Sequence, residues 1–206
     1  LSSSATLIVD ANSSVTIKNL PIGVSYVVEE QNVDNNLYTV AYDYADNMIF
    51  DGTSSGKWCK ATITNTRNTG KLELKKKLAD GTTVPDNANT KFESHVEASP
   101  KVIGDFDIYE KGVKQEKKAI FTDNGANLEV PADGSVVIDG LPAGVKYTVT
   151  ENLDSESDYV IQGEESVEAT LENGKTATAE LTNARKTGKL TVSKSVISSV
   201  PADKTL

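Results

Sequence analysis

Apolar and polar residues alternate with a period of two along much of the chain, which is typical of strands that bury one face. The clearest example is LELKKKL, whose every second residue points to one side: Leu72, Leu74, Lys76 and Leu78. Short turn-forming groups such as ADG, DNG and ENG separate these segments. Strands rich in Val, Ile, Thr and Tyr at such short intervals predict an all-β fold, an antiparallel β-sandwich.

Two further predicted strands carry one polar residue each on their apolar side. In KYTVTE, Tyr147, Val149 and Glu151 share a side. In TATAELTNAR, Leu181 and Asn183 share a side with two alanines. Both segments therefore predict a buried polar group at the end of an otherwise apolar stripe.

A helix is expected almost nowhere in the chain. No segment has a convincing apolar stripe at i, i+3, i+4 and i+7. Residues 96–118 are the least regular, and the pattern allows a short helix only there.

The chain repeats itself. VTIKNLPIGVSYVVEE at 15–30 returns as VVIDGLPAGVKYTVTE at 136–151, which is 121 positions later. ATITNTRNTGKLELKKKL at 61–78 returns as AELTNARKTGKLTVSKSV at 179–196, which is 118 positions later. Recurrence at a nearly fixed period predicts an array of like modules.

The copies predict three segments. Residues 1–69 form a module that lacks its N-terminal strands, 70–187 form a complete module, and 188–206 are the first strand of a following module. Two interpretations fit these boundaries. Either the chain is a segment of a longer protein made of tandem modules, or its last strand is donated to the first module of a neighbouring chain.

Composition narrows the class of protein. Hydrophobic residues make up 37% and aromatic residues 6%, which suits the thin core between two sheets. A net charge of −9 argues against binding to nucleic acid, because a phosphate backbone requires clustered Lys and Arg. One histidine and one cysteine exclude the usual zinc clusters and an internal disulfide, so no metal or cofactor is expected. No apolar run reaches membrane-spanning length, so no membrane insertion is expected.

A lysine, a glutamate and an asparagine recur at sheet-facing positions in both copies. In the complete module they are Lys76, Glu151 and Asn183. Their counterparts in the other copies are Lys194, Glu30 and Asn65. Burial of such groups without partners costs several kcal/mol each. They predict either a satisfied Lys–Glu ion pair hydrogen-bonded to the Asn, or a reactive site.

Three sequence blocks carry a family resemblance. GKLxxxK, LPxGxxYxVxE and TNxRxTG, in this order and in two copies, resemble Cna B-type domains, the repeat modules of Gram-positive surface adhesins and pilins. The resemblance implies immunoglobulin-like or prealbumin-like sandwiches with an intramolecular isopeptide bond. It assigns Lys76 as the nucleophile, Asn183 as the acyl donor and Glu151 as the proton shuttle.

This chemistry is physically reasonable in a sandwich core. Desolvation lowers the pKa of an enclosed lysine and makes its neutral, nucleophilic amine accessible. An acid in the same enclosure can hold a proton, bind the Asn carbonyl oxygen and relay the proton to leaving ammonia. Folding brings the groups together once per module, so the protein is not expected to be a turnover enzyme.

The expected function is structural. We expect a secreted, wall-associated stalk or pilus-like segment on a Gram-positive cell surface, with neighbouring repeats of the same protein as its partners. One alternative is an adhesin module that binds a host protein or glycan directly. Another is a filament subunit joined end to end with identical chains, in which Lys194 of one chain meets Asn65 of the next beside Glu30.

Overall fold

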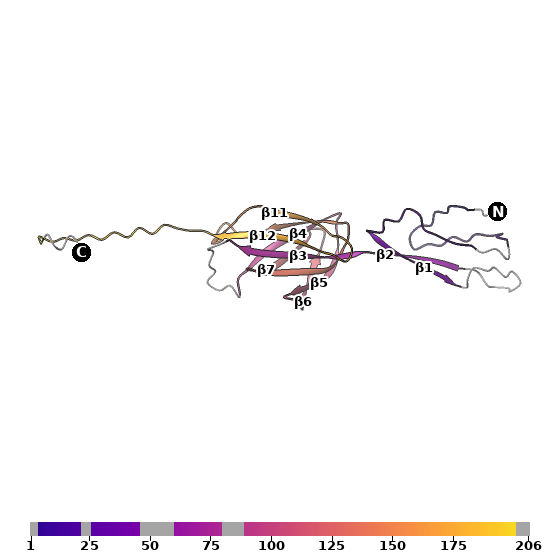
Figure 1. The fold of residues 1–206 in the computed structure, drawn as a ribbon, viewed down its shortest axis with the longest axis horizontal. Coiled ribbons are helices and arrows are strands. Elements are labelled where there is room, and N and C mark those ends of the chain that lie inside the picture. The colour runs from indigo at the N-terminus through magenta and orange to yellow at the C-terminus, as the bar shows by residue number, and fades with distance from the viewer. Residues whose placement is uncertain (1–3, 22–25, 46–59, 80–88, 201–206) are drawn as a thin grey trace. The chain divides into compact units, whose positions relative to one another are not determined.

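The computed structural model describes residues 4–21, 26–45, 60–79 and 89–200, and every regular element among them is a β-strand. The chain divides into two compact units, which we call unit 1 (Leu1–Arg67) and unit 2 (Asn68–Leu206). Figure 1 shows the strands of both units. The predicted all-β class is confirmed.

Unit 2 is a sandwich of two sheets. The six-stranded sheet has the order β10-β12-β3-β8-β5-β6, and the four-stranded sheet has the order β11-β9-β4-β7. The strands of the first are β3 (Thr69–Leu78), β5 (Gly104–Glu110), β6 (Val113–Phe121), β8 (Ser135–Pro142), β10 (Tyr159–Ile161) and β12 (Thr176–Arg185). Those of the second are β4 (Lys91–Ser99), β7 (Ala126–Pro131), β9 (Lys146–Glu151) and β11 (Ser166–Thr170).

The core of unit 2 lies between these sheets and follows the predicted alternation. In β3, Leu72 and Leu74 are buried while their neighbours point outward. In β9, Tyr147 and Val149 are fully buried, and in β12 Leu181 joins the same apolar cluster. The stripes read from the sequence are therefore the inner faces of the sandwich.

One strand pair departs from the expected antiparallel arrangement. β3 and β12 run parallel, with Leu181 opposite Lys76 and Asn183 opposite Leu78, and they lie side by side in Figure 1. The other ladders of unit 2 among the described strands are antiparallel. Parallel neighbours require a long connection, and here that connection is nearly the whole module. The first and last strands of unit 2 are thus direct neighbours.

The short helix allowed at 96–118 is wrong. This stretch contains the end of β4, all of β5 and most of β6. Its pattern is irregular because β6 is an edge strand that is exposed along most of its length, and because the β5–β6 register shifts between Asp107 and Tyr109. An edge strand with a bulge loses the strict alternation that identifies a buried strand.

The tyrosine of the LPxGxxY block makes the same hydrogen bond in both units. The Tyr147 hydroxyl donates to the Pro142 carbonyl at 3.3 Å, and the Tyr26 hydroxyl donates to the Pro21 carbonyl at 3.1 Å. Gly144 in this turn has φ +72°, a conformation in which a residue with a Cβ is strained. In unit 2 the block therefore forms a turn that a hydrogen bond from its tyrosine stabilises.

Among its described residues, unit 1 has one antiparallel pair, β1 (Tyr38–Ala45) with β2 (Lys60–Arg67). By the repeat, β1 corresponds to β10 and β2 to β12. The described residues before β1 form turns and extended backbone without a ladder.

The predicted strand at 188–206 forms no ladder over its described part, residues 188–200, and its last six residues lie outside the described part of the chain. Its apolar residues are exposed, with Leu190 at 86% and Val192 at 82%. This prediction stays a prediction, because no ladder of the strand is found among the described residues.

Candidate functional site

Lys76 lies in the interior of unit 2. It follows Leu72 and Leu74 on the inward face of β3, and its side chain is 1% exposed. The Nζ atom stands 4.9 Å from the centroid of the Phe92 ring, which β4 supplies from the opposite sheet. An ammonium over an aromatic face is attracted to it, so Phe92 helps to hold the amine in place.

Glu151 joins the lysine to the asparagine. The Lys76 amine donates to Glu151 Oε2, and the Asn183 amide donates from Nδ2 to Glu151 Oε1 at 2.7 Å. All three residues are at most 5% exposed. β9 brings the acid from one sheet, while β3 and β12 bring the amine and the amide from the other. The structure therefore brings these three predicted residues together around one carboxyl group.

The register of the parallel pair explains why the Lys76 amine and the Asn183 amide reach the same carboxyl group. Asn183 lies opposite Leu78, which is two residues beyond Lys76 on the same face of β3. Such diagonal neighbours are within reach of a long side chain. An antiparallel pairing of these strands would oppose a different set of residues.

Burial governs the charge of the amine. Desolvation lowers the pKa of Lys76 below the ordinary value of 10.5, and the hydrogen bond and charge of Glu151 offset this only in part. A neutral amine is accordingly more accessible here than on the surface. The sequence analysis also predicts a lowered pKa for this lysine, so the two agree in direction.

The orientation of the Asn183 amide differs from the expected one. The expected contact joins the acid to the amide oxygen, whereas here Nδ2 faces Glu151 and buried Oδ1 has no hydrogen-bond partner among the described residues. A half-turn about the Cβ–Cγ bond would present Oδ1 to a proton on the carboxyl group. Both assignments leave one amide atom hydrogen-bonded to the carboxyl group of Glu151.

Unit 1 holds the acid and the amide of the same set. Asn65 Nδ2 donates to Glu30 Oε1 at 2.8 Å, and the backbone N–H of Glu30 donates to the Tyr42 hydroxyl at 3.1 Å. Glu30 Oε2 is buried without a hydrogen-bond partner among the described residues. Lys194 belongs to unit 2 and lies on the exposed segment that follows β12.

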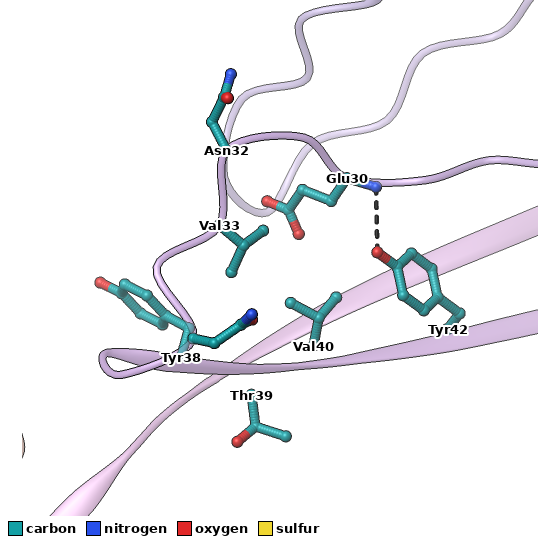
Figure 2. A pocket seen from close by; sticks show the side chains of 8 residues that line it. Glu30, Asn32, Val33, Tyr38, Thr39, Val40 and Tyr42 are labelled. Carbon is teal, nitrogen blue, oxygen red and sulfur yellow. Dashed lines mark hydrogen bonds between the residues drawn. The ribbon is translucent and has the colours of Figure 1, made fainter. Parts of the chain in front are cut away.

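A hollow of about 630 Å³ opens beside Glu30. Figure 2 shows the Glu30 carboxyl group between Val33 and Val40, whereas Asn32 and Thr39 point away from it. The hollow lies beside a carboxyl group whose second oxygen is buried, whereas in unit 2 the equivalent carboxyl group accepts a hydrogen bond from Lys76.

Sequence reasoning missed Phe92, the ring that covers the amine. The available signal was the alternation in KFESHV, which places Phe92, Ser94 and Val96 on one buried side. Phe92 also packs edge-on against Tyr159 at 5.2 Å between centroids. The identity of the ring over Lys76 could not be read locally, because β3 and β4 lie in different sheets.

The lowered pKa of Lys76 predicts a pH-dependent stability in a chain with Asn183→Ala, where no bond to the amide can form. Between the folded-state pKa and 10.5, the unfolded chain binds more protons at this lysine than the folded chain does. The free energy of unfolding should therefore gain a contribution that rises with pH through this window. Urea titrations at several pH values measure it. The matched chain with Asn183→Ala and Lys76→Met should lack this rise, and equal slopes in both chains would contradict the assignment.

Neither a membrane-spanning helix nor a metal-ion site is found among the described residues. No helix there is long and apolar enough to cross a membrane. No group of three or more His, Cys, Asp or Glu residues in that same part of the chain is placed to hold a metal ion.

The sequence matches one family profile, described as "Domain of unknown function (DUF7601)", over residues 1–67 and 70–185. No curated protein matches the chain.

Solved structures with some similarity include a pilus adhesin and two pilins. The pilus-presented adhesin Spy0125 (Cpa) is 18% identical with a TM-score of 0.43, over 57% of this chain and 27% of that chain. The major pilin protein (T3.2) from Streptococcus pyogenes serotype GAS13637 is 17% identical with a TM-score of 0.43, over 77% and 65%. GBS52, the minor pilin of Streptococcus agalactiae, is 23% identical with a TM-score of 0.34, over 66% and 57%. The chain thus spans about a quarter of the length of the adhesin.

Proposed function

The chain belongs to the DUF7601 family, whose profile covers most of both units, and we propose that unit 2 is a structural module that cross-links itself. The observation that carries the proposal is the single buried carboxyl group of Glu151, which accepts hydrogen bonds from both the Lys76 amine and the Asn183 amide. An ion pair alone would not require a lysine and an asparagine to converge on one acid in a dry interior. The convergence supports bond formation between them.

The proposed reaction transfers an acyl group once. The neutral Lys76 amine attacks Cγ of Asn183, so the Nζ–Cγ bond forms and the Cγ–Nδ2 bond breaks. Glu151 passes one proton from Nζ to Nδ2, which leaves as ammonia. The folded sandwich supplies the proximity, because the reacting groups sit on adjacent strands and are buried.

The bond would change how the module carries load. Force that enters at the start of β3 would pass along this strand to Lys76, cross to Asn183, and leave at the end of β12. Residues 77–182 would then lie outside the load path. This supports a role as a rigid spacer, and we place the protein on the surface of a Gram-positive cell as a stalk or pilus-like segment among like repeats.

Intact mass tests the chemistry. The full chain should weigh about 17 Da less than its sequence predicts, because one ammonia leaves per bond. Lys76→Ala, Glu151→Ala and Asn183→Ala should each restore the unmodified mass. Peptide mapping should recover a branched peptide that joins Lys76 to Asn183.

Lys75→Ala is the matched control. Lys75 is the adjacent residue of the same strand, but it points outward and pairs with Glu180 at 3.0 Å. This variant should keep the mass deficit. A parent chain with the unmodified mass would leave a buried ion pair as the role of the three residues.

A further inference from the structure

The part of β3 that carries Lys76 extends beyond the ladder that joins this strand to β8. The last residue pair of that ladder is Lys75 opposite Ser135, and Ser135 is the first residue of β8. Lys76 and Leu78 therefore lie past the end of β8, at the position where β3 contributes the amine to the site.

A tight turn continues the hydrogen bonding of β3 past this point. The Lys76 N–H donates to the Gly134 carbonyl at 2.8 Å, and the Gly134 N–H donates to the Pro131 carbonyl at 3.1 Å, which closes the turn at 131–134. The next N–H on the same side of β3 belongs to Leu78, and it donates to Asp133 Oδ1 at 2.8 Å. The Asp133 side chain thus takes the place of a backbone carbonyl and adds one more hydrogen bond to the ladder.

The backbone of Asp133 has a conformation that suits this role. Its φ is +48°, in the left-handed region that Asp and Asn enter more readily than most residues with a Cβ. In the repeat, Asn12 occupies the corresponding position of unit 1 with φ +59°, and the Ser13 N–H donates to the Asp10 carbonyl at 3.1 Å. Both copies therefore place a left-handed residue with a side-chain oxygen in this turn, and the two residues differ in charge.

The added hydrogen bond lies next to the reacting groups. Leu78 is the residue opposite Asn183 in the parallel ladder. The Ala79 N–H donates to the Asn183 carbonyl at 2.8 Å on the other side of the strand. The turn and β12 together therefore hold the backbone of β3 from Lys76 to Ala79 on both sides.

We propose that Asp133 is a positioning residue for the cross-link between Lys76 and Asn183, an inference that rests on the function proposed for unit 2. Its side-chain oxygen fixes Leu78, and thereby keeps the Lys76 amine in register with the Asn183 amide. Attack on an amide carbon requires a near-attack geometry, and a displacement of about 1 Å lowers such a rate by about 100-fold. Asp133 takes no part in the proton transfer, so an uncharged acceptor oxygen is sufficient at this position.

The rate of bond formation tests the inference. The full chain is synthesised in a short cell-free pulse in the cold, samples are stopped in acid at intervals, and intact mass gives the fraction that has lost about 17 Da. Asp133→Gly tolerates the left-handed backbone but removes the acceptor oxygen, and it should slow the reaction by about 10- to 100-fold. Asp133→Asn keeps the backbone preference and the oxygen, and it should react as fast as the parent chain.

Two controls separate positioning from stability. Each substitution is also made in the Asn183→Ala chain, where no bond forms, and a cooperative urea transition there shows that unit 2 is folded. Asp123→Ala changes an aspartate of another tight turn, which backbone hydrogen bonds between Thr122 and Gly125 close, and it should leave the rate unchanged. A merely structural role of Asp133 would lower the urea midpoint of Asp133→Gly and leave the rate of the folded chain at the parent value.

The contrary outcomes are distinct. Asp133→Gly with the rate of the parent chain would overturn the positioning role, while the mass loss would leave the proposed function intact. Asp133→Asn as slow as Asp133→Gly would overturn it too, because an uncharged oxygen would then be insufficient. An Asp133→Gly chain without a urea transition in the Asn183→Ala background would assign the residue to stability alone. A parent chain that never loses mass would overturn the proposed function, and this inference with it.

Discussion

Glu151→Ala is expected to lower the melting temperature of unit 2 more than any other single change at the site, by about 25–40 °C in the full chain. The substitution removes the proton relay, so the bond between Lys76 and Asn183 should not form. A cross-link that closes a loop of roughly a hundred residues contributes about 4–5 kcal/mol, by analogy with a disulfide. The substitution also leaves the Lys76 amine buried without its partner, which costs about 3–5 kcal/mol more. Differential scanning calorimetry of the full chain measures the sum.

Two further chains separate these contributions. Asn183→Ala loses the bond but keeps the Lys76–Glu151 pair, and it should lower the melting temperature by about 15–25 °C. The double change Lys76→Met with Glu151→Leu removes both charges and fills their volume, so it should melt near Asn183→Ala and above Glu151→Ala. If Glu151→Ala melted within a few degrees of the parent chain, neither the cross-link nor the buried pair would stabilise unit 2 as proposed.

The second large effect is mechanical. When the chain is pulled from its ends, unit 2 of the parent should not extend, because force passes from β3 to β12 through the bond and bypasses residues 77–182. Asn183→Ala should instead release about 350 Å of contour length when unit 2 unfolds, from about 3.4 Å per residue less the length of the folded module. Single-molecule force spectroscopy measures this length.

Lys75→Ala again serves as the control, since it alters an exposed ion pair on β3 and leaves the site unchanged. It should behave as the parent does, without extension of unit 2. An extension of about 350 Å in the parent chain would mean that no covalent link joins the two strands.

Much of unit 2 could be predicted from the sequence. The inward faces of β3, β9 and β12 followed from alternation, because the side-chain period of a strand is a local property. The same alternation marked the three polar residues of the site. It failed for β5 and β6, because β6 is exposed along most of its length and the register between the two strands shifts.

The strand class, the repeat, and the polar residues that interrupt the apolar stripes could be read from the sequence, because each of these depends on neighbours along the chain. The parallel pairing of β3 with β12, the contact of Glu151 with both Lys76 and Asn183 from the opposite sheet, and the position of Phe92 over the amine follow from the folded arrangement of the strands. Strand pairing and sheet packing join residues far apart in sequence, and their direction and register depend on the burial of the whole core. The buried Glu30 oxygen that has no hydrogen-bond partner among the described residues could not be predicted for the same reason, because its burial depends on groups packed around it.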